Sequence, residues 1–166
     1  MTKIIEWLIS GPKLTGGIEQ VVTGTISSSA SNSYLGAHVM LNVYVVNRRI
    51  KPTTVKGFEV FARINGEWKR AELTVIPEGF KLSDIAVEFS KSRLYDKVGL
   101  ELLQYGKGVH GWLRMTFLGE PVEQVRLADW RVELTDAFDK KHIIKQRYRP
   151  GTGGAVYFPD SGINQN

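Results

Sequence analysis

The chain of 166 residues contains no cysteine. This absence excludes disulfide frameworks, thiolate zinc sites, iron–sulfur clusters and cysteine nucleophiles as a group. Such a composition is common in reducing compartments, so it slightly favours the cytoplasm without establishing the compartment. We expect no cofactor, because no other residue pattern in the chain is typical of a cofactor site.

Long apolar runs are also lacking. The first residues, MTKIIEWLISGPKL, are interrupted by Glu6 and end in Gly11 and Pro12. A membrane-spanning helix needs roughly 20 apolar residues, and a signal peptide needs a longer apolar core with a small-residue cleavage site. We therefore expect no transmembrane segment. Residues 1–17 are expected to form an N-terminal extension that either packs as a terminal element or docks on a membrane or a partner.

Charge is the one unusual feature of the composition. Hydrophobic residues make up 42% of the chain and charged residues 23%, which is typical of a single soluble globular domain. The formal net charge is +5, and the segment from Arg48 to Arg70 contains seven basic residues against two acidic ones. The excess positive charge is concentrated in this segment, which makes it a candidate binding surface.

Apolar and polar residues alternate through most of the chain, which predicts half-buried β-strands. Strands are expected in residues 18–28, 38–47, 57–64, 83–89, 110–119 and 130–136. Within these segments, the residues that share the apolar face of their strand are Val39, Leu41, Val43, Val45, Phe58, Val60, Ala62, Ile64, Leu113, Met115, Phe117, Trp130, Val132 and Leu134.

Asn65 and Gly66 separate two alternating segments. Both central residues of a type I′ turn need a positive φ, and Asn-Gly tolerates this conformation best. The pair therefore predicts a tight β-hairpin, whose second strand covers residues 67–76 and ends before Pro77.

Only the segment SKSRLYDKVGLELLQYG has a helical pattern, with Ser90 or Ser92 as N-cap and Gly106 as a stop. We expect a turn or two of helix in a crossing between sheets. Because each sheet must cover its apolar face, the predicted fold is all-β: an antiparallel β-sandwich of seven to eight strands with one short helix. The domain is expected to span residues 18–149, followed by a flexible tail at 150–166.

The segment LNVYVVNRRIKPTTVKGFEV resembles a recurrent pattern in immunoglobulin-like sandwich domains of uncharacterised bacterial proteins, and more loosely in late-embryogenesis-abundant and fibronectin-like accessory domains. The pattern is an alternating strand that ends in Asn47, a polar loop with Pro52 and Thr53, and a second alternating strand. Asn47 is expected to leave its strand through a positive φ or a side-chain hydrogen bond to the backbone. The segments GKGVHGWLRMTF and LADWRVELTDAFDK resemble the closing strands. The resemblance implies an immunoglobulin-like fold and supplies no catalytic residue.

No catalytic motif is evident. His38, His110 and His142 are far apart in the sequence and lack the close spacing of a metal site. The Ser-rich loop at 27–33 has no G-x-S-x-G frame, and GTGGA lacks the ending of a phosphate-binding loop. We therefore expect neither an enzyme nor a metal site.

Four acidic residues lie near the last predicted strand: Asp129, Glu133, Asp136 and Asp139. Paired acids can serve glycoside hydrolysis, and clustered ones can hold calcium. Glu133, however, faces outward, and the sequence around the other acids is typical of a strand end and a turn. Solvated side chains are the favoured interpretation.

Two basic groups and two tryptophans are the candidate binding residues. The second basic group is the segment KKHIIKQRYR. Arg and Lys beside aromatic rings can contact a phosphate backbone and stack on bases, although charges on strands and loops also prevent edge-to-edge pairing of sheets. Two exposed tryptophans could form a shallow aromatic surface, or both could pack in the core. The candidates are Arg48, Arg49, Lys51, Arg63, Arg70, Lys140, Lys141, Arg147, Trp68 and Trp112.

Three functions follow from these observations. The leading hypothesis is a non-catalytic interaction or structural module that binds a protein partner through an exposed sheet face or edge, with a homodimer left open. The second is binding of nucleic acid or another polyanion through the two basic groups. The third is a hydrolase or carbohydrate-active domain that uses the acids.

Overall fold

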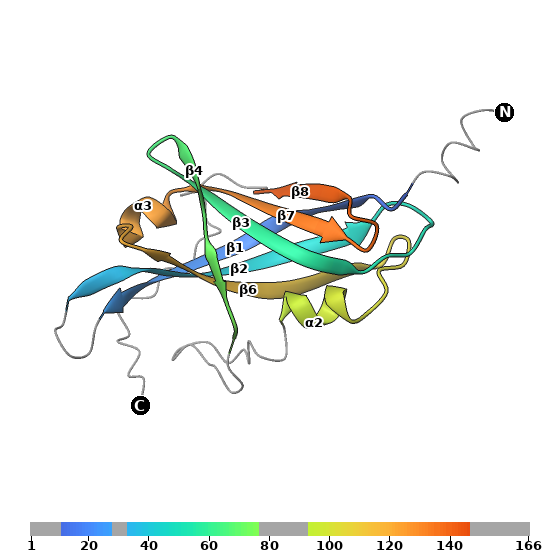
Figure 1. Cartoon of the computed structure of the whole chain (residues 1–166), viewed down its shortest axis with the longest axis horizontal. Coiled ribbons are helices and arrows are strands. Elements are labelled where there is room, and N and C mark those ends of the chain that lie inside the picture. Colours follow the sequence, from blue (N-terminus) through green and yellow to red (C-terminus); the bar gives the residue numbers. More distant parts are fainter. Residues whose placement is uncertain (1–10, 28–32, 77–92, 147–166) are drawn as a thin grey trace.

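A computed structural model describes residues 11–27, 33–76 and 93–146. These residues form two antiparallel four-stranded sheets that pack face to face, with two short helices at the margins (Figure 1). The strand orders are β1-β2-β6-β5 in the first sheet and β4-β3-β7-β8 in the second. The predicted all-β antiparallel sandwich is confirmed.

Sheet 1 consists of β1 (Leu14–Ser27), β2 (Tyr34–Asn47), β6 (Gly108–Leu118) and β5 (Glu72–Thr74). Sheet 2 consists of β4 (Glu67–Arg70), β3 (Val55–Ile64), β7 (Asp129–Asp136) and β8 (Lys141–Lys145). The helices are α2 (Leu94–Gly99), before β6, and α3 (Val122–Arg126), between β6 and β7.

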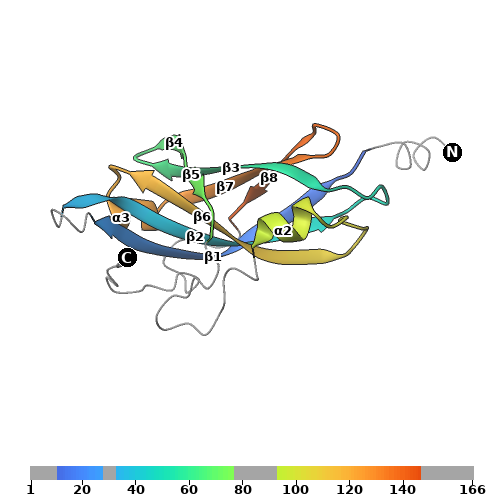
Figure 2. The same cartoon turned by 60° about the horizontal axis from the view of Figure 1, so that its bottom comes forward.

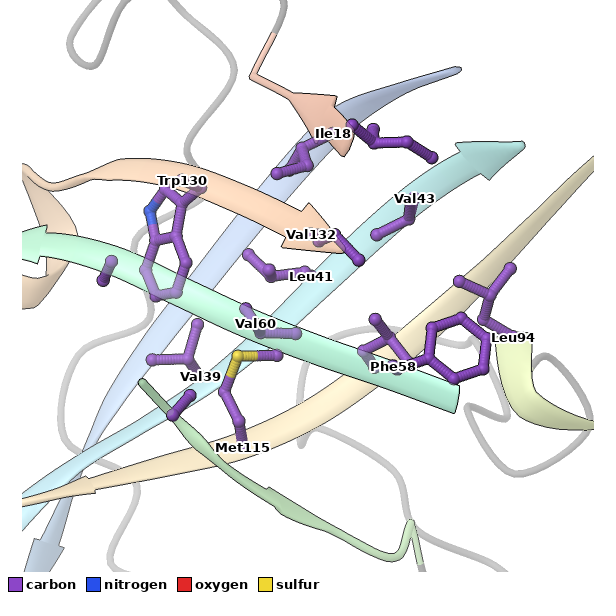
Figure 3. Close-up of a cluster of buried hydrophobic side chains, with 14 of the residues drawn as sticks. Ile18, Val39, Leu41, Val43, Phe58, Val60, Leu94, Met115, Trp130 and Val132 are labelled. Atoms are coloured by element: carbon purple, nitrogen blue, oxygen red, sulfur yellow. The ribbon is translucent and has the colours of Figure 1, made fainter. Parts of the chain in front are cut away.

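The core lies between the two sheets and is built by the alternating strands. Every side chain that the alternation assigns to the apolar face of β2, β3, β6 and β7 belongs to one buried cluster. Figure 3 shows Leu41 of β2 close to Val60 and Val132 of the opposite sheet. The rings of Phe117 and Trp130 meet edge to face across the core, with their centres 5.7 Å apart. The predicted apolar faces are confirmed.

The β3–β4 hairpin has the predicted turn. Asn65 and Gly66 have φ values of 52° and 85°, and Ile64 pairs with Glu67 on the returning strand. Positive φ at both central residues is what a type I′ turn requires.

The strand predicted for residues 67–76 is in fact two strands. β4 pairs with β3 in sheet 2, whereas β5 pairs with β6 in sheet 1. Between them, Ala71 is buried and donates its N–H to the Val60 carbonyl at 2.8 Å. The chain therefore crosses from one sheet to the other at Ala71, which joins the two layers along one side of the sandwich.

β5 pairs only with Arg114–Thr116, in the C-terminal half of β6, and helix α2 fills the remainder of that side. Leu94 and Val98 insert into the core. The helix approaches β6 closely at Gly111, where a Cβ atom would lie 2.4 Å from the Cα of Leu94. Figure 2 shows α2 beside β6 at the margin of the sandwich.

The predicted helix is shorter than its sequence pattern. It ends at Gly99, well before Gly106, which has a φ of 73° in the loop that follows. The predicted N-caps, Ser90 and Ser92, lie outside the described residues.

Two elements were not indicated by the sequence pattern. Helix α3 begins directly after Pro121 and is held to the β3–β4 turn by a 3.1 Å hydrogen bond from Asn65 Nδ2 to Gln124 Oε1. Strand β8 pairs with β7 and contains part of the second basic group. Its alternation is obscured because Ile143, between the inward-facing His142 and Ile144, points outward.

The opposite side of the sandwich is closed by contacts between β1 and β8. Ile18 forms a parallel bridge with Gln146. The buried His142 accepts a hydrogen bond from the Leu14 N–H at Nδ1 (3.3 Å), and its Nε2 lies 2.8 Å from Asp136 Oδ2. Since Nδ1 is the acceptor, Nε2 carries the proton and donates to the carboxylate. This arrangement fastens β1 of sheet 1 to sheet 2.

The first strand begins at Leu14, so sheet 1 includes the last residues of the predicted extension at 1–17. The strand predicted at 83–89, the tail at 150–166 and the candidate Arg147 lie outside the described residues. Among the residues that the structure describes, no helix has the length and apolarity needed to cross a bilayer.

Candidate functional site

The basic residues between β2 and the end of β4 do not form one surface. Arg48, Arg49 and Lys51 occupy the β2–β3 loop, whereas Arg63 and Arg70 lie on the β3–β4 hairpin. β3 has ten residues. At about 3.3 Å per residue, Arg63 lies roughly 26 Å from the start of β3, and Phe61, which pairs with Arg70, lies roughly 20 Å from it. The charge that is concentrated in the sequence is therefore divided between two regions of the fold (Figure 1).

The outer face of sheet 2 carries an aromatic cluster. The Arg131 guanidinium lies over two rings, 4.6 Å from the centre of Phe61 and 4.7 Å from the centre of Trp68. These distances are within the range of cation–π attraction. Trp68 remains 43% exposed. Arg131 is distant in the sequence from Phe61 and Trp68, and the register of β3, β4 and β7 brings the three together.

A network of ion pairs lies beside this cluster. Glu59 and Glu133 are directly opposite each other on β3 and β7, which is unfavourable for like charges. Arg70 contacts Glu59 at 3.1 Å, Arg131 contacts Glu133 at 3.1 Å, and Lys141 reaches both carboxylates at 3.1 and 3.5 Å. Three cations thus neutralise the two acids.

The network shifts two pKa values in opposite directions. The hydrogen bond from Lys141, and then its charge, lower the pKa of Glu59. The same interactions with Glu59 raise the pKa of Lys141. Arg63 and Lys145 are the cations of this face that form no ion pair with another described residue, although Arg63 donates to the Gly66 carbonyl at 3.2 Å.

Trp112 does not join this surface. It points outward from β6 in sheet 1, on the opposite side of the sandwich, and is only 9% exposed. The hypothesis of one aromatic surface shared by Trp68 and Trp112 is therefore wrong, because the two rings belong to the outer faces of different sheets.

The outer face of sheet 1 is shielded from solvent around Met40, which has no exposed area. On the same face the buried His38 accepts a 2.9 Å hydrogen bond at Nε2 from Arg114 Nε. Burial, and then the charge of Arg114, lower the pKa of His38 to about 4. His38 is therefore neutral at pH 7 and acts as a hydrogen-bond acceptor within the structure.

Asn47 organises the loops at one end of the sandwich. Its buried Oδ1 accepts the N–H groups of Lys13 (3.4 Å) and Arg49 (3.0 Å). Its Nδ2 donates to the carbonyls of Lys51 (2.8 Å) and Leu103 (3.1 Å). These are the side-chain bonds to the backbone predicted for Asn47, and they hold together three separate segments of the chain.

We call this region the loop end. It comprises residues 11–13, the β2–β3 loop, the loop between α2 and β6, and the β7–β8 turn, which lie at the same end of the sandwich (Figures 1 and 2). The ammonium group of Lys51 lies 4.0 Å from the centre of the Phe138 ring. The Ala137 N–H donates to the Thr54 carbonyl at 3.0 Å. Lys140 of the second basic group is therefore near Lys51 of the first.

Two kinds of side chain are solvent-accessible at the loop end. The basic ones, of which Arg49 is half-buried and the others are exposed, are Lys13, Arg48, Arg49, Lys51, Lys107 and Lys140, with the exposed Lys56 beside them at the start of β3. The exposed large apolar ones are Ile50, Leu100, Leu102, Tyr105 and Phe138. Sequence reasoning identified several of the cations but none of these apolar residues.

Of the acids near β7, Asp136 helps to build the fold, whereas Asp129 and Asp139 are exposed. Asp136 is fully buried and accepts the N–H groups of Phe138 (2.8 Å) and Lys140 (3.0 Å) as well as His142. Burial acts to raise the pKa of Asp136, but the hydrogen bonds from His142 and the two N–H groups lower it below its ordinary value. Asp139 pairs with Lys56.

A shallow hollow of about 390 Å³ lies where the chain crosses from β4 to β5. Its lining consists of Phe58, Glu59, Arg70, Ala71, Glu72 and Leu73, and includes neither Asp129 nor Asp136. Within the described ranges, no group of three or more His, Cys, Asp or Glu residues is placed to hold a metal ion. The chain matches no protein-family model, and no match was found among curated proteins or among solved structures.

Proposed function

We propose that this protein is a non-catalytic interaction module with an immunoglobulin-like sandwich, and that it binds a protein partner through the outer face of sheet 2. The observation that carries the proposal is the Arg131 guanidinium held over Phe61 and Trp68 on an open sheet face. Trp, Tyr and Arg dominate the binding energy of protein interfaces. The ring contacts position these side chains in advance, which reduces the entropy lost on binding.

The strand order supports the immunoglobulin-like part of the proposal. Constant-type immunoglobulin domains place strands A, B, E and D in one sheet and C, F and G in the other. With strands lettered in chain order and β4 taken as an additional strand C′, the sheets here are A-B-E-D and C′-C-F-G. Antibody domains join strands B and F by a disulfide. In this chain Leu41 of β2 and Val132 of β7 pack in the core instead.

The composition of the face supports a protein partner. Trp68 and Ile143 are exposed apolar groups, and the ion pairs around Glu59 and Glu133 provide polar groups that are already satisfied. An apolar centre with a polar surround is the usual anatomy of a protein interface.

Site-specific photo-crosslinking in the native host tests the proposal. A photoreactive residue at position 68 or 143 is expected to capture one specific protein. Capture of a second copy of this chain is one of the outcomes that support the proposal. Trp68→Ala is expected to weaken binding of that protein by about 30-fold or more, which corresponds to the loss of a hot spot.

The control position is Leu118, an exposed apolar residue at the end of β6 in sheet 1. Equal capture from positions 68 and 118, or no capture from either position on sheet 2, would contradict the proposal. An affinity for the captured protein that is insensitive to Trp68→Ala would contradict the assignment of the surface.

The two alternative functions have less support. On sheet 2, Arg70, Arg131 and Lys141 already pair with Glu59 and Glu133, which leaves few cations for a polyanion. This function predicts an affinity for single-stranded RNA that falls steeply with salt. A hydrolase would need free acids in a cleft, whereas Asp136 is buried and saturated with hydrogen bonds.

A further inference from the structure

The loop end combines exposed apolar side chains with exposed cations. Ile50, Leu102 and Phe138 come from three different loops, and each is more than half exposed. A single exposed apolar residue needs no explanation. Three from separate loops concentrate exposed apolar area at one end of the sandwich, which is typical of an interaction site.

The loops that carry these side chains are fastened to one another. The Leu103 N–H donates to the Thr53 carbonyl at 2.8 Å, and the Gly106 N–H donates to the Asn47 carbonyl at 2.9 Å. Together with the Asn47 side chain, these bonds connect the β2–β3 loop to the loop before β6. The apolar side chains are thus presented from a connected framework, which reduces the entropy lost when they bind.

The charge of the loop end is strongly positive. Six basic residues lie in these described segments and Lys56 lies beside them at the start of β3, whereas the acids near them are Glu101, Asp139 and the buried Asp136. Asp139 is paired with Lys56. The surface is therefore complementary to a negatively charged partner.

We propose that the loop end docks on an anionic phospholipid surface. The side chains of Ile50, Leu102 and Phe138 enter the boundary between headgroups and acyl chains, and the surrounding lysines and arginines contact lipid phosphates. Apolar burial and attraction to anionic lipid are the two contributions that hold peripheral proteins on membranes. Tyr105 has an apolar ring with a polar tip, which suits the same boundary.

The apolar residues favour lipid over nucleic acid as the occupant. A phosphate backbone would satisfy the cations, and aromatic rings would stack on bases. The aliphatic side chains of Ile50 and Leu102 would gain nothing from either contact. Docking at the loop end also leaves the outer face of sheet 2 free, because the strands run along the long axis of the molecule (Figure 1).

Vesicle flotation with the purified full chain tests this proposal. The protein is expected to bind phosphatidylcholine vesicles that contain about 30% phosphatidylserine, and to bind pure phosphatidylcholine vesicles at least tenfold more weakly by an order-of-magnitude estimate. Combining Arg48→Ala, Lys51→Ala and Lys140→Ala is expected to weaken binding by about 100-fold, because each cation near an anionic surface contributes about fivefold.

A matched control removes the same charge elsewhere. Arg63→Ala, Arg70→Ala and Lys145→Ala together lower the net charge equally, but on the outer face of sheet 2. This variant is expected to keep more than about half of the vesicle affinity. That loss is much smaller than the loss of about 100-fold expected for the loop-end variant. Circular dichroism and thermal melting confirm that each variant is folded before it is compared.

Insertion of the apolar side chains is tested separately. Because the chain has no cysteine, Ile50→Cys and Leu118→Cys can each carry a single environment-sensitive dye. Anionic vesicles are expected to shift the emission of the dye at position 50 to the blue and to leave that at position 118 unchanged. Ile50→Ser with Phe138→Ser is expected to weaken vesicle binding by about tenfold or more.

Three results would overturn the proposal. The first is equal binding to vesicles with and without phosphatidylserine, and the second is an equal loss from the two triple variants. The third is binding of single-stranded RNA with no blue shift at position 50 on vesicles, which would assign the loop end to nucleic acid. Trp68→Ala is expected to leave vesicle binding unchanged, so the outcome is independent of the protein partner proposed for sheet 2.

Discussion

The outer faces of the two sheets carry the same sequence pattern but differ in solvent exposure. Trp112-Leu113-Arg114 on β6 and Trp68-Lys69-Arg70 on β4 each place a tryptophan and an arginine on the outward face of a strand. Trp112 is nevertheless buried, whereas Trp68 is exposed. A period of two shows which residues share a face, but it does not show whether that face is covered.

The path of the chain explains the difference. At the β5 edge of sheet 1, Arg114 donates to the Val75 carbonyl at 3.1 Å, and Arg93 forms a parallel β-bridge with Trp112. In sheet 2, by contrast, Arg70 pairs with Glu59 of the same face. Outward residues of β6 thus contact residues of neighbouring segments, whereas outward residues of sheet 2 contact one another.

Truncating each of the two tryptophans is the most sensitive test of the difference in burial between the two outer faces. Trp112→Ala is expected to lower the free energy of unfolding by about 3–5 kcal/mol, because it leaves a cavity in a buried site. Trp68→Ala is expected to lower it by less than about 1 kcal/mol, because the residue is already 43% exposed and its removal leaves no enclosed cavity. Urea denaturation measures both, and equal losses would show that the two faces are equally covered.

The pH dependence of stability is expected to come from the covered face. His38 has a pKa of about 4 in the folded protein, against an ordinary value of 6.5. The unfolded chain therefore binds the proton more tightly, so the contribution of neutral His38 is complete above about pH 6.5 and is lost as the pH falls toward 4. Over this window the free energy of unfolding is expected to fall by about 3 kcal/mol.

His38→Gln isolates this contribution. Glutamine still offers Arg114 an acceptor but does not titrate. The unfolding free energy of the variant is expected to be flatter than that of the wild type between pH 6.5 and 4. Denaturant titrations at several pH values measure the slopes. Parallel slopes in the two proteins would mean that His38 is protonated at a similar pH in the folded and unfolded states.

On the open face, the largest single effect is expected from Arg131. Arg131→Ala removes the contacts with Phe61 and Trp68 and the ion pair with Glu133, and it is expected to cost about 1–2 kcal/mol. Arg131→Lys keeps the charge but not the planar guanidinium, so it is expected to recover only part of the loss. Full recovery of the unfolding free energy by lysine would show that charge alone matters there.

The smallest effect is expected from the exposed ion pairs. Glu59→Gln removes the partner of Arg70 and Lys141 and is expected to change the unfolding free energy by less than about 1 kcal/mol. The difference from the wild type is expected to shrink in high salt, because solvent-exposed charges are screened. The control is Glu67→Gln, at an exposed position on the same hairpin. A loss that persists in high salt would mean that the network is shielded from solvent.

Much of the fold follows from local sequence. The alternation in β2, β3, β6 and β7 identifies the core side chains, since strand geometry sends successive residues to opposite faces. Asn65-Gly66 specifies its turn because few other pairs tolerate the required φ values. Asn47 ends its strand because its amide can replace ladder hydrogen bonds with side-chain bonds to the backbone.

The candidate surfaces depend on information that is not local. The crossing at Ala71 continues the same period of two, so the alternation contains no sign of the change of sheet. The contacts of Arg131 with Phe61 and Trp68 depend on the register of three strands. The loop end depends on Asn47 and Thr53 drawing separate loops together.

The sequence by itself determined the class of fold, the buried face of most strands and the position of the hairpin, because these follow from side-chain period and backbone preference. Only the tertiary structure decided which outer face is covered, and it divided one basic segment between sheet 2 and the loop end. The physical reason is that alternation acts within a strand, whereas coverage and surface composition arise from pairing between segments that are remote in the chain.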